Sequence, residues 1–262
     1  MNWRPRLVAL DIDGTLTHVG SNDISPAVKA AITRVTEHGS LVVLSTGRSV
    51  IGTTPIAAQV PTSFAICSNG AVWWDPARAE VTKRTTFDPG PTIKTLQALL
   101  PDTVFAVEQT GVGSLSLGEF LPGDLWGTTR QATFDELAAT PTPRLVMRWL
   151  DHTPAELSFA LRDLELPGVE WSVDHTEAWL TAVPLNVSKG SALEELRQEL
   201  GISASDTLAI GDGGNDVEML RWAALGVAMG QAPARVHAVA DEIGPSVLED
   251  GAAQVLSRFF PA

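Results

Sequence analysis

Cysteine is almost absent from this chain, whose 262 residues include a single one, Cys67. One cysteine excludes an intrachain disulfide, so the cysteine content gives no support for secretion into an oxidising compartment. Cys67 ends the apolar run Phe64–Cys67. Because free thiols in apolar surroundings are usually buried, we expect a structural thiol in the core.

Long hydrophobic runs are also missing. Before Asp11 the chain has only the apolar run Leu7–Leu10, which is shorter than the roughly 7–15 apolar residues of a signal peptide. No segment approaches the roughly 20 apolar residues of a membrane-spanning helix. The sequence therefore predicts a cytoplasmic protein with no membrane partner.

Positive charge is scarce, with 18 Lys and Arg against 31 Asp and Glu, for a net charge of −13. A negative field of this size repels a phosphate backbone and anionic lipid, so nucleic acid is not an expected partner. A small anionic substrate would also be repelled. If the chain binds one, local positive groups or a bound cation must overcome the field.

Apolar residues are plentiful, at 44% of the chain against 19% charged, which is the balance of a folded globular protein. The length exceeds that of a typical single domain. It leaves room for a second, smaller domain or for one domain with a large insertion.

The first part of the chain alternates strand and helix patterns. Three short apolar runs are typical of strands buried on both faces: Arg6–Leu10, Leu41–Leu44 and Phe64–Cys67. Between the first two, Ser25 and Pro26 are typical of a helix start, and Gly39 of its end. This order predicts a parallel sheet covered by helices.

The same alternation returns late in the chain, where we expect a helix at 190–200, strands at 207–210 and 226–229, and helices from Asn215, at 233–240 and at 252–259. Both ends therefore predict one α/β domain with a doubly wound parallel sheet, formed by residues 1–77 and 184–262. The middle, 78–183, mixes Thr- and Trp-containing stretches with helical patterns at 92–100 and 154–164. It predicts an inserted α+β domain.

Polar motifs follow the predicted strands. Asp11–Thr15 comes directly after the first strand, at the edge where ligands bind in such sheets. Two carboxylates two residues apart share a site only if the chain leaves the strand, and Gly14 permits that turn. Taken alone, the segment is also typical of an Asx turn with solvated carboxylates.

Three further segments are ambiguous when each is taken alone. Ser45–Arg48 offers a hydroxyl and backbone amides to an oxyanion, but it is also an ordinary helix cap. Ser68–Gly70 is turn-like. Lys189 opens a helix, where a cation gains most from a nearby anion, although isolated lysines there are usually exposed.

The segment Gly211–Asp216 brings two carboxylates and an amide to a strand end, as hard ligands for Mg²⁺ or as a loose acidic loop. All these segments lie at carboxyl ends of predicted parallel strands and so converge on one crevice. There Asp11, Asp212 and a backbone carbonyl would bind the cation. The expected donors to phosphate oxygens are Thr46, Lys189 and Asn215.

The ordered motifs resemble those of the haloacid dehalogenase-like hydrolases, and among them the Cof-type phosphatases with a type IIB (C2) cap. The four motifs are Asp11–Leu16, Thr46–Arg48, Lys189–Gly190 and Gly211–Asp216, and Ser68–Ala71 and Val227–Gly230 are also similar. Gln231 departs from the family pattern, in which an Asn is usual, and we expect no effect on the chemistry. The resemblance covers essentially the whole chain and identifies 78–183 as the cap.

The resemblance implies a Mg²⁺-dependent phosphatase acting on a small phosphorylated metabolite such as a sugar phosphate. Asp11 would be the nucleophile that forms an aspartyl-phosphate, and Asp13 the general acid and base. Asp11, the Asp13 backbone carbonyl and Asp212 would bind Mg²⁺, with Asp216 supporting them.

The remaining motif residues would hold the substrate. Thr46 and Lys189 are expected to contact the transferring phosphoryl group as catalytic residues. The expected substrate-binding set is Thr46, Gly47, Arg48, Asn69, Lys189 and Asn215.

Two other functions stay open at this point. A phosphosugar mutase of the same superfamily would return the phosphoryl group to substrate, and a receiver-like module would accept phosphate on Asp11 as a signal. The long insertion argues against the receiver. Cap residues that are candidates for substrate contact by charge alone are Lys83, Arg84, Arg144 and Arg148, each of which is more typical of an exposed surface residue. The sequence indicates neither the substrate nor the oligomeric state.

Overall fold

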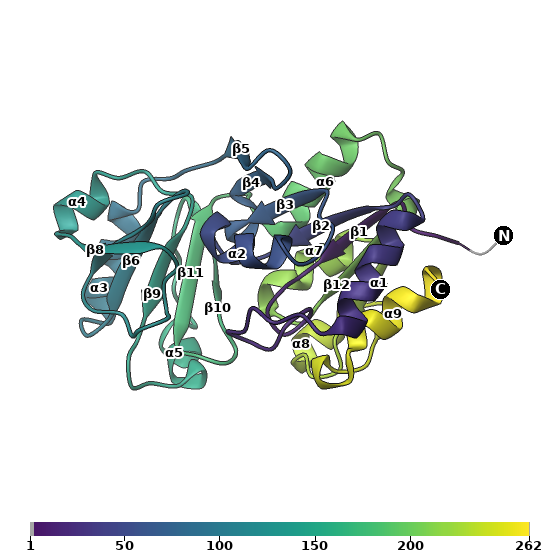
Figure 1. Cartoon of the computed structure of the whole chain (residues 1–262). Helices are drawn as coiled ribbons and strands as arrows, with labels where there is room; N and C mark the ends of the chain where they lie inside the picture. The colour runs from purple at the N-terminus through teal and green to yellow at the C-terminus, as the bar shows by residue number, and fades with distance from the viewer. Residues whose placement is uncertain (1–2, 262) are drawn as a thin grey trace.

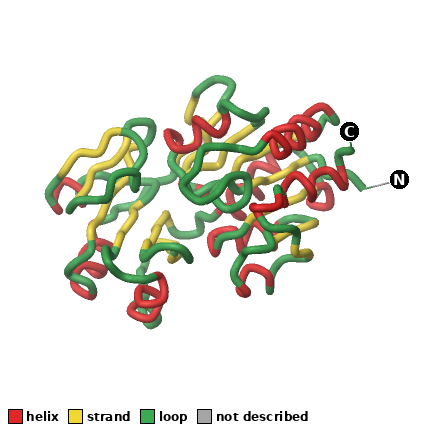
Figure 2. Tube along the Cα trace, turned by 60° about the horizontal axis from the view of Figure 1, so that its bottom comes forward, coloured by secondary structure: helices red, strands yellow, loops and turns green. Residues whose placement is uncertain are grey.

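The computed structural model describes residues 3–261 and contains two separate β-sheets within that range (Figures 1 and 2). The larger sheet has the order β14-β13-β12-β1-β2-β3-β4-β5. Its strands are β1 (Leu7–Leu10), β2 (Leu41–Ser45), β3 (Phe64–Cys67), β4 (Val72–Asp75), β5 (Glu80–Arg84), β12 (Thr207–Gly211), β13 (Leu225–Ala228) and β14 (Glu242–Ile243). From β14 to β3 all neighbours are parallel, whereas β4 and β5 add an antiparallel edge.

Helices cover both faces of this sheet, as predicted for a doubly wound fold (Figure 1). They are α1 (Pro26–Glu37), α2 (Val50–Ala57), α6 (Lys189–Glu199), α7 (Val217–Trp222), α8 (Ala234–His237) and α9 (Gly251–Phe259). Strand β1 explains the continuous apolar pattern: Val8 and Leu10 enter one buried cluster, and Leu7 and Ala9 enter the other. A strand buried on both faces needs apolar residues at every position.

The smaller sheet, in the order β10-β11-β9-β6-β7-β8, is formed entirely by the middle of the chain. Its elements are α3 (Gly90–Leu99), β6 (Val104–Gln109), β7 (Gly113–Leu117), β8 (Thr128–Gln131), α4 (Phe134–Ala138), β9 (Leu145–Arg148), α5 (Pro154–Ala160), β10 (Val169–Val173) and β11 (Trp179–Pro184). All neighbours except β7 and β8 are antiparallel. One face packs its apolar side chains under the helices as a core of its own.

The chain leaves the larger sheet later than the sequence indicated. The insertion was predicted to begin at 78, but β5 pairs with β4 inside the larger sheet. The turn between Asp75 and Glu80, which marked a boundary in the sequence, is a hairpin turn within the core. We call residues 85–184 the insert and the other described residues the core. The first and last segments that the structure describes both lie on the core, away from the insert (Figure 1).

The single cysteine lies in the core of the protein. Cys67 is fully buried, as predicted, and burial raises the pKa of its thiol to about 12. Among residues 3–261 no helix combines the length and the apolar character needed to cross a membrane.

A buried ion pair joins the insert to the core. The Arg144 Nε donates to Glu108 Oε2 over 3.0 Å, and its Nη1 donates to the Gly47 carbonyl oxygen over 2.7 Å. The same Glu108 oxygen accepts a 2.7 Å bond from the Ser68 hydroxyl. Glu108 and Arg144 belong to the insert, whereas Gly47 and Ser68 follow β2 and β3 of the core. This clamp therefore fixes the insert against the strand ends.

We expect the clamp to be sensitive to loss of the Arg144 guanidinium, because its partner, the Glu108 carboxylate, is buried. Arg144→Met should lower the free energy of unfolding by about 3–5 kcal/mol, because Glu108 is left charged and buried. The double variant Arg144→Met/Glu108→Gln should recover most of the loss, since a neutral amide still accepts the Ser68 bond. Denaturant unfolding measures both.

The matched control is Arg162→Met, which removes an arginine with 55% of its side chain exposed. It should change the free energy of unfolding by less than about 0.5 kcal/mol. Equal losses in the single and double variants would contradict a stranded charge as the cause.

Candidate active site

Asp11 lies at the carboxyl end of β1, buried, with its backbone N–H bonded to the Ile210 carbonyl oxygen of β12. The chain then turns out of the strand, and the Gly14 N–H bonds the Thr17 carbonyl oxygen. Gly14 has φ +80°, and a Cβ there would lie 2.1 Å from Asp212 Oδ2. Glycine is needed at this position because it permits both the turn and the close approach of the Asp212 loop.

Lys189 is the first residue of α6 and is fully buried. Its Nζ lies 2.6 Å from Asp11 Oδ1 and 2.6 Å from Asp216 Oδ1. Burial lowers the pKa of Lys189, but the negative charges of Asp11 and then Asp216 outweigh burial and raise it above its ordinary value. Lys189 is therefore a permanent positive charge beneath Asp11, not the exposed lysine typical of helix starts.

Asp216 organises the loop that follows β12. Its Oδ2 accepts bonds from the backbone N–H groups of Asp212, at 2.9 Å, and Gly213, at 2.8 Å, while Oδ1 accepts from Lys189. Gly211 is closely packed against this carboxylate, since a Cβ would lie 2.5 Å from Asp216 Cγ. The loop is thus fixed by a side chain that is itself held by Lys189.

Three carboxylates meet at this point. One oxygen from each of Asp11, Asp212 and Asp216 lies within 4.8 Å of the others. Burial, followed by the charge of Asp216, raises the pKa of Asp11 well above its ordinary value despite Lys189. Burial and Asp216 likewise raise the pKa of Asp212 to about 7. Crowded, buried carboxylate oxygens are the donor set of a hard divalent cation, so these residues fit such an ion.

Asp13 is oriented by Arg48 in a two-pronged ion pair. Arg48 Nη2 lies 2.6 Å from Asp13 Oδ1, and Nε lies 2.7 Å from Oδ2. The other Arg48 bonds go to Asn22 Oδ1 and to the Ser21 and Gly52 carbonyl oxygens. The bonds of Arg48 are thus made within the core. Arg48 also lines the cavity described below, and its expected contact with substrate stays a prediction.

The other predicted residues lie around the same point but at different depths. Gly47, Asn69 and Asn215 line the cavity described below, and Asn215 Nδ2 donates to Asn69 Oδ1 over 2.9 Å. Thr46 is almost fully buried, and its hydroxyl accepts a 3.1 Å bond from the Arg48 backbone N–H. Like Lys189, Thr46 lies behind the wall of the cavity rather than in it.

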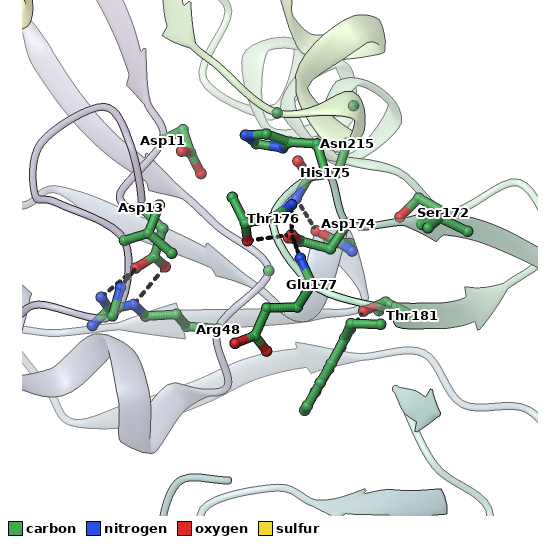
Figure 3. A pocket seen from close by; sticks show the side chains of 18 of the residues that line it. Asp11, Asp13, Arg48, Ser172, Asp174, His175, Thr176, Glu177, Thr181 and Asn215 are labelled. Carbon is green, nitrogen blue, oxygen red and sulfur yellow. Dashed lines mark hydrogen bonds and ion pairs between the residues drawn. The ribbon is translucent and has the colours of Figure 1, made fainter. Parts of the chain in front are cut away.

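A cavity of about 500 Å³ opens above Asp11 and is bounded by both the core and the insert. Figure 3 shows Asp11, Asp13 and Asn215 of the core facing the β10–β11 loop of the insert. That loop supplies the polar side chains of Asp174, His175, Thr176 and Glu177, and Ser172 of β10 continues the wall. The insert therefore covers the carboxyl ends of the core strands.

Sequence reasoning missed this loop and the two tryptophans that complete the wall. His175 reaches the core, with Nε2 3.9 Å from Asp212 Oδ2. Trp126 lies against Arg48, whose guanidinium carbon is 5.3 Å from the ring centre, and Trp179 also lines the cavity. No motif marked these residues, because their position depends on how the insert folds and docks.

The four basic residues singled out by charge as cap candidates differ in their surroundings, and two of them, Lys83 and Arg84, lie in β5 of the core instead. Arg144 lines the cavity, and Arg148 binds two carboxylates that line it. Lys83 instead pairs with Glu195 on the core, and neither it nor Arg84 lines this cavity.

Gln231, the departure from the family pattern, is close to the carboxylate cluster. Its Nε2 donates to the Gly14 carbonyl oxygen over 2.6 Å and to Asp212 Oδ2 over 3.3 Å, and its Oε1 accepts from the Val247 N–H. These bonds link the turn after β1 with the loop after β12. Gln231 therefore contacts a residue proposed to bind the cation.

Comparison with known proteins gives matches along most of the chain. The haloacid dehalogenase-like hydrolase family matches residues 8–109 and 165–256. Pyridoxal phosphate phosphatase YbhA of Escherichia coli is 28% identical over 277 residues, covering 96% of this chain and 97% of that protein. The fold matches that of the subclass IIB sugar phosphatase BT4131, with a TM-score of 0.81 at 23% identity and with 97% and 98% of the two chains covered.

Two relatives of higher identity match only in part. A chloroplastic endoribonuclease YBEY of Arabidopsis thaliana is 45% identical over 80 residues, and a phosphoglycolate phosphatase of Methanoculleus marisnigri is 43% identical over 75 residues. These stretches are 30% and 29% of this chain, and 14% and 32% of the relatives' own lengths. With the ordered motifs gathered around Asp11 and the family match on both sides of the insert, the chain belongs to the haloacid dehalogenase-like hydrolases.

Proposed function

We propose that this protein is a Mg²⁺-dependent phosphatase that hydrolyses a small phosphomonoester through an aspartyl-phosphate on Asp11. The observation that carries the proposal is the placement of Asp11 beneath a roofed cavity of about 500 Å³, with the Lys189 ammonium 2.6 Å away. A buried carboxylate held by a permanent cation is a nucleophile with a fixed direction of attack.

In the first step, an oxygen of Asp11 attacks phosphorus and the bond to the leaving oxygen breaks. Lys189 neutralises charge at the floor, and Asn215 donates an N–H from the rim. Gly47 and Asn69 line the space beside them, and Thr46 holds the backbone of the same loop through its bond with the Arg48 N–H. The transferring group is thereby held in line with Asp11.

Asp13 is the proposed proton carrier. It gives a proton to the leaving oxygen in the first step and takes one from the water that hydrolyses the acyl phosphate in the second. Asp13 lines the cavity with 34% of its side chain exposed. Arg48 orients both of its oxygens, so Arg48 is a positioning residue in this scheme.

Asp11, Asp212 and the backbone carbonyl of Asp13 are the proposed Mg²⁺ ligands, with Asp216 supporting the loop. When bound, the cation offsets negative charge on the phosphoryl group and on the crowded carboxylates. A cation bound there would also attract an anionic substrate locally, against the long-range repulsion from the net charge of −13.

The substrate is proposed to be a small phosphorylated metabolite, such as a sugar phosphate. The size of the cavity and the names of the similar proteins, a pyridoxal phosphate phosphatase and a sugar phosphatase, support this class. A cytoplasmic location and the exclusion of nucleic acid and membrane as partners remain predictions from the sequence.

The stabilisation of the protein by Mg²⁺ should depend on pH. The pKa of Asp212 is raised from its ordinary 3.8 to about 7 without metal, so protonation of Asp212 favours the folded state at low pH and this contribution is lost as pH rises toward 7. Since Mg²⁺ requires the ionised carboxylate, the rise in Tm on adding Mg²⁺ should be larger at pH 8 than at pH 5.5. Thermal unfolding with EDTA or Mg²⁺ measures it.

Asp212→Asn removes the titrating group and serves as the control. It should reduce the pH dependence of the Mg²⁺ effect, leaving the part that comes from Asp11, and raise the Mg²⁺ concentration needed for turnover. Hydrolysis of an aryl phosphate that continues unchanged in EDTA would contradict the metal assignment.

Replacing the two carboxylates of the first motif should produce different failures. Asp11→Asn should form no phosphoenzyme, because an amide cannot make an acyl phosphate. Asp13→Asn should slow both steps by about 10²–10⁴-fold with a poor leaving group. With an aryl phosphate, whose leaving group departs without protonation, the phosphoenzyme should accumulate.

Acid quench with ³²P-labelled aryl phosphate measures the trapped label. Label on the Asp11→Asn protein, or normal turnover by the Asp13→Asn protein, would show that the roles are assigned wrongly. Incubation with hexose phosphates and analysis for isomers separates hydrolysis from the mutase reaction.

A further inference from the structure

Three arginines at the cavity are already neutralised by carboxylates. They form the ion pairs Arg48 with Asp13, Arg144 with Glu108, and Arg148 with Asp124. In each pair one side chain at least lines the cavity. These arginines therefore offer no uncompensated positive charge to a substrate.

Arg148 pairs with a second carboxylate besides Asp124. Its Nη2 lies 3.1 Å from Glu177 Oε2, while its Nη1 binds Asp124 Oδ1. The other Asp124 oxygen accepts a 2.9 Å bond from the Leu121 N–H, which fixes Asp124 in place. Glu177 has 51% of its side chain exposed and lines the cavity. One guanidinium between two carboxylates leaves one negative charge, and the exposed one belongs to Glu177.

Asp174 adds a second negative charge in the same loop. Its Oδ1 accepts bonds from the Thr176 N–H at 2.6 Å and from the Glu177 N–H at 3.1 Å, as well as from the Thr176 hydroxyl. These three donors fix the position of the carboxylate. Figure 3 shows Asp174 among His175, Thr176 and Glu177, facing the core residues across the cavity.

The positive groups lie at the other end. Lys189 is buried beneath Asp11, and Arg235, which forms no ion pair among the described residues, lies beside Gly214 with its Nη2 3.5 Å from the Val173 carbonyl oxygen. The proposed Mg²⁺ ligands are also at that end. The cavity is thus polarised, with compensation for a phosphoryl group on the core side. On the insert side lie Asp174, which is in no ion pair among the described residues, and Glu177, which shares Arg148 with Asp124.

The remaining surface of the insert side is aromatic and hydroxyl-bearing. Trp126 and Trp179 present rings to the cavity, and the Trp179 Nε1 donates to the Thr181 hydroxyl over 3.2 Å. Ser172 also lines this wall. Ring faces, hydroxyls and carboxylates accept the C–H faces, hydroxyls and ammonium groups of a polyhydroxylated molecule.

We propose that the cavity selects phosphomonoesters whose leaving group is an alcohol of about sugar size that is cationic or neutral, and rejects those with a second negative charge. This inference rests on the proposed phosphatase function and names the substrate class of the same site. An amino group should be preferred to a hydroxyl, because it compensates Asp174 and Glu177. A carboxylate or second phosphate would face both of them.

Two matched pairs of esters test the charge preference. Glucosamine 6-phosphate and glucose 6-phosphate share a ring and differ by an ammonium group at neutral pH, whereas sorbitol 6-phosphate and 6-phosphogluconate share an open chain and differ by a carboxylate. We expect kcat/KM to favour the more positive member of each pair by about tenfold, the effect of one charge at ~6 Å in a partly solvated site. p-Nitrophenyl phosphate is the common reference.

The variant Glu177→Gln tests whether the wall formed by the insert causes the charge preference. It should reduce both ratios several-fold, by lowering kcat/KM for glucosamine 6-phosphate and raising it for 6-phosphogluconate. Glu165→Gln makes the same charge change at an exposed position of the insert that does not line the cavity, and both ratios should stay at the wild-type values.

The outcomes separate this inference from the proposed function. Hydrolysis of all four esters with equal kcat/KM within each pair would overturn the charge selection and leave the phosphatase intact. Unchanged ratios in Glu177→Gln would overturn the role of Glu177. If no phosphate is released from any ester, including p-nitrophenyl phosphate, the proposed function fails and this inference fails with it.

Discussion

The buried ammonium of Lys189 is the interaction on which the rest of the site depends. It binds Asp11 and Asp216 at 2.6 Å each, and Asp216 in turn holds the backbone of the loop that carries Asp212. Without this cation the carboxylates would repel one another in a region of low dielectric, and the two strand ends would separate. One side chain thus fixes the geometry of β1, β12 and α6 at the point where they meet.

The sequence could predict this meeting point but not the walls around it. Asp11, Asp212 and Asn215 follow parallel strands, and parallel strands align their ends at one edge, so their convergence follows from topology. The partner of Arg48 could not be predicted in this way, because a long side chain reaches whatever the folded loops bring near it. The loop at Asp174 is harder still, since its position depends on the register of an antiparallel sheet and on the docking of the insert.

The core and the insert contribute groups of opposite charge to the cavity. The core supplies a fixed positive charge, Lys189, under the proposed phosphoryl position, in a chain whose net charge is −13. The insert contributes negative, aromatic and hydroxyl groups, with its own arginines held by Glu108 and Asp124. Because the pair Glu108–Arg144 also contacts Ser68 and the Gly47 carbonyl oxygen, the insert is tied to the loops that are proposed to bind phosphate.

The central position of β1 also has a consequence for how the chain is made. Leu7 pairs with Leu41 on one side and with Thr207 on the other, so the middle strand acquires its second neighbour only after some four-fifths of the chain has been synthesised. Until then one edge of β1 has no partner strand, and closing so long a loop costs entropy before any contact compensates it. The insert, with its own core, can fold in the meantime. On the ribosome the crevice should therefore be completed late, when Lys189 and the 211–216 loop reach the end of β1.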